Sequence, residues 1–270
     1  MQNDNVLLEH KGHVAVVTFN RPQRRNAFNE QMWAGLKRIV AQLQTQTPRV
    51  VVVTGAGQAF CAGFDVNPDN PQVSGLIGAV ERREREPVEA LIRLLQETVH
   101  ALVSLPVPVI AAVNGDAYGG GAELASRCDL RVMDPAAVFC FSEARLGLMP
   151  DWGGGPGLTK LIGVSRAADM ILTGRKVGAG EALSIGLINR ISGTGMALSE
   201  AIKLAETIAQ NGPRAIRHAL VVIRQAAELP MNAALKLERE QAVSLIVSGE
   251  CIHGITAFLS KQKPLFPDME

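Results

Sequence analysis

Two apolar, β-branched runs each end in a glycine-rich turn, and this pairing limits the folds that the chain can adopt. Residues 49–54 read Arg-Val-Val-Val-Val-Thr and lead into the Gly-Ala-Gly of 55–57. Residues 109–113 form a second such run, followed by Asn-Gly and then by the glycine triplet of 119–121. Continuous β-branched runs are typical of strands buried on both faces of a parallel sheet. Because parallel strands need helical connections, the sequence predicts an α/β fold of repeated ββα or βαβ units.

Other segments fit the same alternation of strands and helices. Strands are predicted over residues 13–20, 49–54, 109–113, 130–133 and 137–141. A helix is predicted over 29–45, because its apolar residues recur at helical spacing after Asn29, a favourable N-cap. The glycine triplet is predicted to open a helix through Glu123, and the glycines of 153–157 to precede a helix that ends near Gly163.

Two regions depart from this alternation. Residues 66–90 hold three prolines, several glycines and the charge cluster 81–86, so they predict a mobile connection that passes into a helix ending near Leu105. The alternating charges of the cluster indicate a solvated helix face. From residue 199 onward the chain reads as helices broken near 212–213 and 230. The predicted domains are therefore an α/β core over 1–198 and a helical region over 199–270.

Charge and composition exclude several classes of function. The 270 residues carry a net charge of +1 and no basic stripe interleaved with aromatics, which argues against a nucleic acid partner. The sequence has no apolar run of 18 residues and begins with polar residues, which argues against a membrane partner or a leader. Its four cysteines form no C-x-x-C pair and fit buried thiols in a reducing compartment. We expect a cytoplasmic protein.

Several common binding motifs are missing. A dinucleotide fingerprint fails because the third residue after Gly57 is Phe60, and the Gly-Lys-Ser/Thr of a phosphate-binding loop does not occur. His10 and His13 form H-x-x-H, but on a strand they would point to opposite faces, and no further cluster completes a metal site. The G-x-S-x-G elbow of serine hydrolases is also missing. We therefore expect no metal.

The glycine-rich turns suit the stabilisation of a negative oxygen. Glycines let the backbone enter a helix tightly, and the first N–H groups of that helix have no helical acceptor. Two such groups aimed at a thioester carbonyl would form an oxyanion hole, each lowering the barrier by ~3–4 kcal/mol when the enolate forms. For either turn taken alone, a simple strand-to-helix connection is the favoured interpretation.

Taken in order, the motifs resemble the crotonase superfamily of enoyl-CoA hydratases and isomerases. The matching segments span nearly the whole chain: 20–22, 26–28, A-F-C-A-G-F-D at 59–65, N-G-x-A-x-G-G-G-A-E-L-A-x-x-C-D at 114–129, 142–150, and 257–261. The resemblance implies a crotonase-like spiral of ββα units with a C-terminal helical trimerisation region. It also implies a homotrimer or a dimer of trimers.

The resemblance implies roles for single residues. Phe64 and Gly120 would supply the two oxyanion N–H groups. The positions that match those around the coenzyme A and acyl groups are Ala27, Ala62, Phe64, Asp65, Val66, Asn67 and Gly120, with Phe258 and Lys261 near the adenine end, often across a subunit boundary. Asn67 departs from the lysine often seen there, which puts its contact in doubt. Coenzyme A would be part of the substrate, so no separate cofactor is expected.

The reaction must be argued from the acids, since the fold is shared by many members. Glu123 lies one helical turn after Gly120, Glu143 follows a strand, and both match the two glutamates of the hydratases. Asp151 stands where ordinary hydratases carry glycine, and Pro-Asp-Trp-Gly-Gly at 150–154 resembles the phenylacetate-pathway isomerases, which commonly lack the second glutamate. Asp151 is either catalytic or an N-cap for the following helix.

Four hypotheses follow. The first is an enoyl-CoA hydratase, because two facing carboxyl groups can divide the activation of water and the protonation of C2. The second is an isomerase of coenzyme A thioesters that uses Asp151 or Glu143 as its single base. The third is a non-catalytic member that binds acyl-CoA or RNA, and the fourth is an acyl-CoA hydrolase. Met149 and Trp152 either line the acyl pocket or belong to the core.

Overall fold

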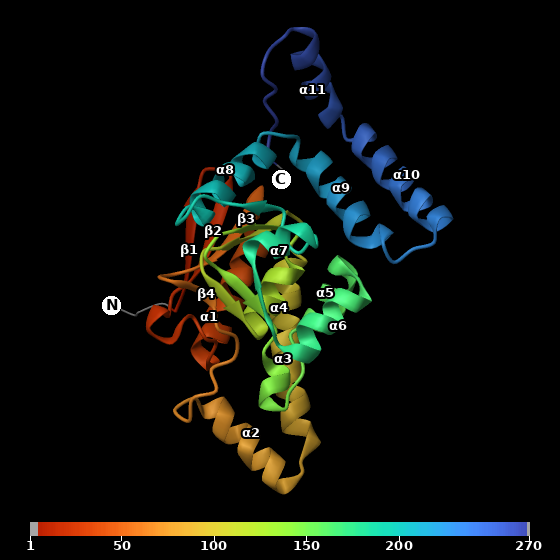
Figure 1. Cartoon of the computed structure of the whole chain (residues 1–270). Helices are drawn as coiled ribbons and strands as arrows, with labels where there is room; N and C mark the ends of the chain where they lie inside the picture. Colours follow the sequence, from red (N-terminus) through yellow and green to blue (C-terminus); the bar gives the residue numbers. More distant parts are fainter. Residues whose placement is uncertain (1–4, 269–270) are drawn as a thin grey trace.

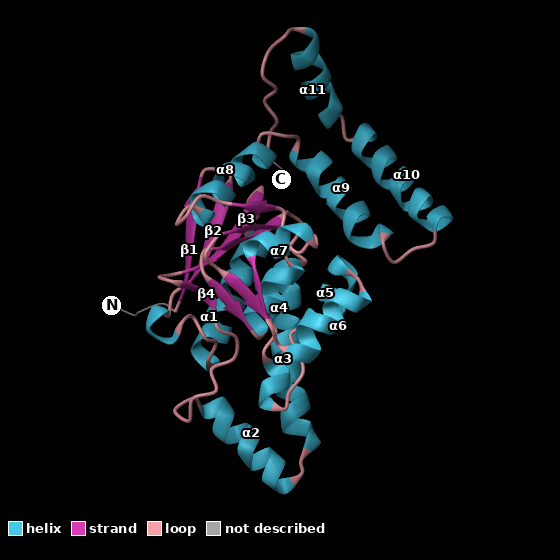
Figure 2. Ribbon diagram, in the orientation of Figure 1, coloured by secondary structure: helices cyan, strands magenta, loops and turns pink. Residues whose placement is uncertain are grey.

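The computed structural model describes residues 5–268 and contains two sheets surrounded by helices (Figures 1 and 2). The larger sheet has the order β1-β2-β3-β5-β7-β10, with strands β1 (Val6–Lys11), β2 (Val14–Phe19), β3 (Val50–Gly55), β5 (Val109–Val113), β7 (Leu130–Met133) and β10 (Arg190–Ile191). The smaller sheet has the order β4-β6-β8-β9, with β4 (Ala59–Cys61), β6 (Asp116–Tyr118), β8 (Val138–Cys140) and β9 (Lys176–Gly178). The predicted α/β class is confirmed.

The helices connect and cover these strands. They are α1 (Glu30–Thr45), α2 (Pro71–Arg82), α3 (Arg85–Val103), α4 (Gly120–Arg127), α5 (Gly154–Ile162), α6 (Val164–Thr173), α7 (Ala179–Ser184), α8 (Ala197–Ala209), α9 (Pro213–Ala226), α10 (Met231–Val247) and α11 (Glu250–Leu259). Asn29 caps α1 as predicted, because its side chain accepts a hydrogen bond from the N–H of Met32 at 3.1 Å. Gly153 is the N-cap of α5, and the other glycines of 153–157 lie in its first turn instead of preceding the helix.

The β-branched run of β3 lies in the middle of the larger sheet, as its composition predicts. β3 pairs in parallel with β2 and β5, and every one of its residues is buried. The side chains of β3 alternate between the two faces of the sheet. Val51 and Val53 belong to the main core, whereas Val50 and Val52 pack with the apolar residues of α8. The predicted domain boundary at 198 therefore falls inside a helix that covers this sheet, and the division into two domains stays a prediction.

The first strand pair corrects the interpretation of the two N-terminal histidines. β1 pairs with β2 antiparallel, so His10 lies on β1 and His13 lies in the turn before β2. The two residues are not on one strand, as the H-x-x-H spacing assumed. The physical reason is the Gly12 turn, where φ is +59°.

Most of residues 66–90, predicted as a connection that passes into a helix ending near Leu105, is helical: α3 is that helix, and α2 was not predicted. Residues 71–82 form α2, with Pro71 in its first turn, where proline is tolerated, and with the Asn70 side chain accepting from the N–H of Gln72. The charge cluster 81–86 is exposed but occupies the junction of α2 and α3, where Arg83 adopts φ +55°. It is therefore not one face of a single helix.

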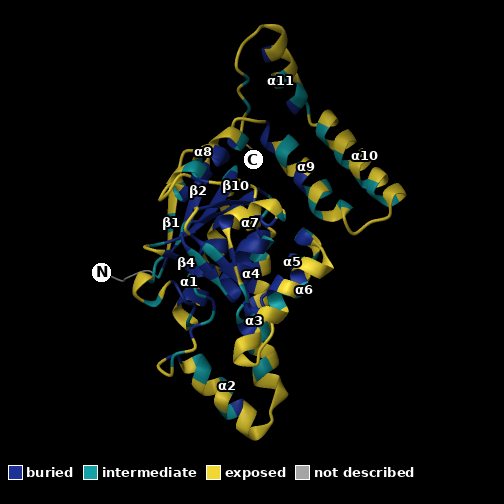
Figure 3. Ribbon diagram, viewed as in Figure 1, coloured by how far each residue is buried: buried dark blue, intermediate teal, exposed yellow. Residues whose placement is uncertain are grey.

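The last three helices extend away from the sheets, and α11 lies at the opposite end of the molecule from α2 (Figure 1). α10 has no buried residue, and Figure 3 shows this part as largely exposed. Among residues 5–268, no single helix is long and apolar enough to cross a membrane; only α10 and α11 together, bent by 71°, reach that length and composition.

Candidate active site

The segment that contains Gly63 and the glycine triplet of 119–121 follow the carboxyl ends of β4 and β6, and they come together there. Phe64 forms a parallel bridge with Phe28, in which the N–H of Phe28 donates to Gly63 O at 2.7 Å and that of Asp65 donates to Phe28 O at 2.9 Å. The Phe64 N–H therefore points to the other side of the strand. Gly63, at φ +84°, lies against α4: a Cβ there would be 2.9 Å from the nitrogen of Gly120. Only glycine permits this approach.

Gly120 begins α4, so its N–H has no acceptor within the helix. A Cβ at Gly120 would be 2.3 Å from the Trp152 ring, and one at Gly121 would be 2.2 Å from the carbonyl oxygen of Cys61. The triplet thus lets the start of α4 fit between β4 and the Trp152 ring. Phe64 and Gly120 line the same cavity.

This cavity has a volume of about 190 Å³ and brings all three candidate acids together. Apolar side chains from α2, α3 and the 146–152 segment form most of its wall: Leu76, Val88, Leu91, Ile92, Leu95, Leu146, Leu148, Met149 and Trp152, with Phe64 and Val66. Glu123, Glu143 and Asp151 are its acidic residues. Three carboxyl groups in an apolar cavity cannot all ionise at their ordinary pKa.

Glu123 is fully buried and is held by main-chain donors at the start of α5. Its carboxylate accepts from the N–H groups of Asp151 at 3.2 Å, Trp152 at 2.8 Å and Gly154 at 2.7 Å. Burial and the nearby charges of Glu143 and Asp151 raise the pKa of Glu123 to about 8, against the opposing effect of these donors. A Cβ at Gly154 would be 2.3 Å from Cγ of Glu123, so this contact also requires glycine.

Glu143 contrasts with Glu123, because neither of its buried carboxylate oxygens has a hydrogen-bond partner among the described residues. Burial raises the pKa of Glu143 and the charge of Asp151 adds to this effect, while its own N–H group and the Glu123 carboxyl group oppose it. The N–H groups that bind Glu123 favour its ionised form, so they oppose the effect of burial on Glu123.

Asp151 does not cap the following helix. The N-cap of α5 is Gly153, without a side-chain cap bond, and the first-turn N–H of Gly154 is bound by Glu123 instead. The side chain of Asp151 lines the cavity, and burial raises its pKa. The cap interpretation of Asp151 is therefore wrong, while a catalytic role stays a prediction.

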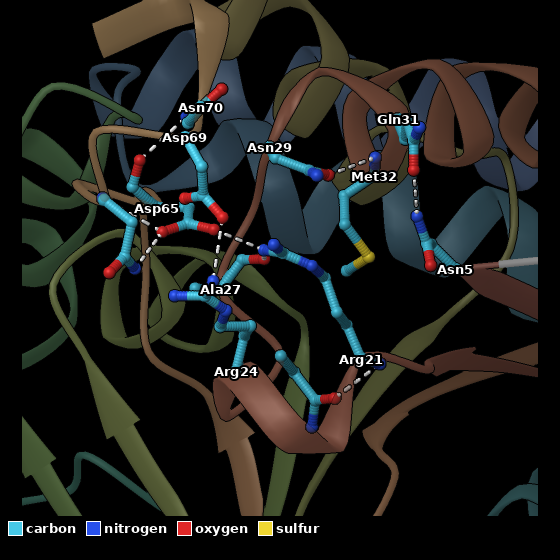
Figure 4. Close-up of polar contacts among 12 residues, drawn as sticks. Asn5, Arg21, Arg24, Ala27, Asn29, Gln31, Met32, Asp65, Asp69 and Asn70 are labelled. Carbon is cyan, nitrogen blue, oxygen red and sulfur yellow. Dashed lines mark hydrogen bonds and ion pairs between the residues drawn. The ribbon is translucent and has the colours of Figure 1, made fainter.

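The segment after Phe64 is organised by one buried ion pair (Figure 4). Asp65 accepts from Arg21 Nη1 at 2.5 Å and from the main-chain and side-chain nitrogens of Asn67 at 3.1 and 2.5 Å. Arg21 also donates to Ala27 O at 3.0 Å. Although burial alone would raise the pKa of Asp65, the hydrogen bonds from Asn67 and Arg21 lower it. The carboxylate of Asp65 is thus engaged within the protein.

The other predicted coenzyme A residues lie in different places. Ala62 borders both the acid-containing cavity and an adjoining polar hollow of about 720 Å³, which Arg25 and Tyr118 also line. Val66 lines the acid-containing cavity, and Ala27 is buried. Phe258 is 82% exposed near the end of α11, and Lys261 follows that helix. Figure 1 shows α11 at the opposite end of the molecule from α2, which forms part of the cavity wall. The roles assigned to these positions stay predictions.

Sequence reasoning missed part of the site. The sequence predicts that residues 66–90 form part of the acyl pocket, and Val66, Leu76 and Val88 do line the cavity. The rest of the α3 wall was not predicted, although Leu91, Ile92 and Leu95 follow Val88 at helical spacing. Trp152 proves to be both core and cavity wall, since it packs on Trp33 with ring centroids 4.6 Å apart. Within residues 5–268, no group of three or more His, Cys, Asp or Glu residues is arranged to hold a metal ion.

Comparison with known proteins agrees with this architecture. A family model described as enoyl-CoA hydratase/isomerase matches residues 9–269. An enoyl-CoA hydratase of Mycobacterium tuberculosis is 34% identical over 97% of this chain and 96% of its own length, and a short-chain-enoyl-CoA hydratase of Clostridium acetobutylicum is 33% identical over 97% of each.

A solved structure agrees as well. The crystal structure of an enoyl-CoA hydratase from Bacillus anthracis superposes with a TM-score of 0.87 at 32% identity, covering 97% of this chain and 98% of that chain. With a family match over nearly its whole length and relatives this similar, the chain belongs to the enoyl-CoA hydratase/isomerase family of the crotonase superfamily.

Proposed function

We propose that this protein is an enoyl-CoA hydratase, which adds water across the C2=C3 bond of a 2-enoyl-CoA thioester. The observation that carries the proposal is the pair of glutamates in one apolar cavity, beside the Phe64 and Gly120 N–H groups. An isomerase needs one base, whereas hydration needs a group for water and a group for C2. Coenzyme A enters as part of the substrate, and the reaction requires no further cofactor.

In the proposed mechanism an ionised glutamate makes one proton transfer and a protonated glutamate makes the other. The thioester carbonyl oxygen accepts from the N–H groups of Phe64 and Gly120, which stabilise the enolate. Glu123, the carboxylate with three N–H donors, takes a proton from water as the water oxygen attacks C3. Glu143 gives its proton to C2. Transfer of a proton from Glu123 to Glu143 then restores the starting state.

Asp151 supports a second candidate function. Its side chain lines the same cavity as the glutamates, so a single base could also move a double bond between C3 and C2. In that reaction Asp151 or Glu143 removes a proton from one carbon and returns it to another, and no water is consumed. Hydratase and isomerase thus differ in which acid is indispensable.

The experiment follows the enone absorbance of crotonyl-CoA, with mass spectrometry to detect the gain of one water. Glu123→Gln and Glu143→Gln should each lower turnover by about 10²–10⁴-fold, the usual contribution of a positioned acid or base. Asp151→Asn should matter less. Loss of turnover in Asp151→Asn alone, with 3-enoyl-CoA converted to 2-enoyl-CoA and either glutamate variant active, would establish the isomerase instead.

We also propose that the protein assembles as a homotrimer or a dimer of trimers. Large apolar side chains are exposed on the C-terminal helices, among them Ile223, Met231, Leu235, Ile246, Ile252 and Phe258. Such exposure is unusual for a monomer. Phe258 and Lys261 would then reach the adenine end of a neighbour's substrate. Light scattering tests the mass of the assembly.

We further propose a cytoplasmic location. Three of the four cysteine thiols are buried, which fits a reducing compartment.

A further inference from the structure

Helix α4 binds both polar groups of the Trp152 main chain. The N–H of Trp152 donates to Glu123 Oε2 at 2.8 Å. Its carbonyl oxygen accepts from Arg127 Nη1 at 2.7 Å. Glu123 and Arg127 are four residues apart on α4, so they lie on the same face of the helix, one turn from each other. The 151–154 segment is thus held at two points by one rigid element.

The glycines at the start of α5 leave space for the Arg127 side chain. A Cβ at Gly153, where φ is +91°, would be 2.7 Å from Arg127 Nη1, and a Cβ at Gly157 would be 3.0 Å from Arg127 Cγ. The glycine cluster of 153–157 therefore does more than begin a helix. It lets the guanidinium lie against the segment whose N–H groups bind Glu123.

We propose that Arg127 is a positioning residue, which holds the Trp152 carbonyl so that the N–H groups of residues 151, 152 and 154 stay directed at the Glu123 carboxylate. Without this hold, the segment is free to turn its donors away, and Glu123 would ionise less readily. The proposal rests on the proposed function only for its effect on turnover. Its effect on Glu123 can be measured whatever reaction the protein catalyses.

The surroundings leave Arg127 available for this contact. The other titratable or charged residues of the hollow around it are His100, Asp129, Lys160, Arg224 and Glu228. The charged groups that act on Glu123 are Glu143, Asp151 and Arg127 itself, and Arg127→Lys retains that positive charge. The acids of the hollow are paired with its other cations, Asp129 with Arg224 at 2.6 Å and Glu228 with Lys160. Arg127 instead donates to the Trp152 carbonyl, while its Nη2 lies 3.2 Å from Nδ1 of His100.

The test compares Arg127→Met, which removes the donor, with Arg127→Lys, which keeps a charged donor of similar reach. Arg127→Gln, too short to reach the carbonyl, serves as a second loss variant if the methionine variant does not fold. Exposed Arg166 on α6 offers a matched charge control, Arg166→Met. The titration of Glu123 is followed by ¹³C NMR of carboxyl-labelled glutamate, assigned from the signal that disappears in Glu123→Gln.

We expect the Glu123 signal to titrate at higher pH in Arg127→Met and Arg127→Gln, and near the wild-type pH in Arg127→Lys and Arg166→Met. With crotonyl-CoA, kcat of the loss variants should fall about tenfold to a hundredfold, as for a misplacement of about 1 Å, with KM changed less than threefold. Unaltered titration of Glu123 in the loss variants would overturn the proposal. If wild-type protein does not hydrate crotonyl-CoA, the proposed function fails, and the NMR titration still decides the role of Arg127.

Discussion

Replacing Gly120 with alanine should impair stability and turnover together, because the added methyl group meets a ring that has no room to move. The new Cβ would lie 2.3 Å from Cε2 of Trp152, whereas ordinary contacts begin near 3.4 Å. Trp152 is 1% exposed and packs on Trp33 and Phe28, with ring centroids 4.6 and 5.5 Å away. Since interiors are close-packed, the ring or the start of α4 must shift by roughly 1 Å.

The size of the effect follows from two opposing contributions to stability. Overpacking of this kind costs about 1–3 kcal/mol, and the better helix propensity of alanine offsets about 0.5–1 kcal/mol. We therefore expect the free energy of unfolding to fall by about 1–2 kcal/mol. In the proposed mechanism a displaced Gly120 N–H no longer meets the enolate oxygen, and the loss of one such donor should lower kcat by about 10²–10³-fold.

Urea unfolding followed by tryptophan fluorescence measures stability, and the decrease in crotonyl-CoA absorbance measures turnover. Gly155→Ala is the matched control, because Gly155 lies in the first turn of α5 and a Cβ there has nothing within 4 Å. That control should be as stable as the wild type or slightly more stable, with unchanged turnover. If Gly120→Ala behaves like Gly155→Ala in both assays, the close approach of Gly120 to Trp152 is not what requires glycine.

Three further outcomes follow from the charges of the site. Glu143→Gln should raise the free energy of unfolding at pH 8 while it lowers turnover, because the Glu143 oxygens are buried and have no hydrogen-bond partner within residues 5–268. A loss of stability in urea titrations would contradict this. Folding raises the pKa of Glu123 to about 8, so the contribution of Glu123 to the free energy of unfolding favours the folded state below pH 4 and is lost as the pH rises toward 8. Glu123→Gln should therefore make the melting temperature depend less on pH over this range. Hydrogen bonds from Asn67 and Arg21 lower the pKa of Asp65, so Asp65 stabilises the folded state above pH 4, and this stabilisation disappears as the pH falls through the folded-state pKa. Asp65→Asn should be less stable than wild type at pH 7 and equally stable in strong acid.

Several elements could be predicted because their signals are local. The β-branched runs of 49–54 and 109–113 form adjacent parallel strands, and the period and N-cap of 29–45 define α1. The α2 helix was missed because proline and glycine weigh against helices in general, whereas Pro71 lies in the first turn, where its missing N–H costs nothing. Local propensity does not identify that position without the cap that precedes it.

By itself, the sequence determined the α/β class, the central strands, the family and the candidate residues of the site, because period, turn chemistry and ordered motifs are properties of neighbouring residues. Only the tertiary structure decided which groups those residues contact and how deeply they are buried. It directs three N–H groups at Glu123, and it buries Glu143 without a hydrogen-bond partner in the part of the chain that the structure describes. It also brought Arg127 to the Trp152 carbonyl. Such contacts join residues some 25 to 30 positions apart, and their geometry depends on how the helices and strands pack.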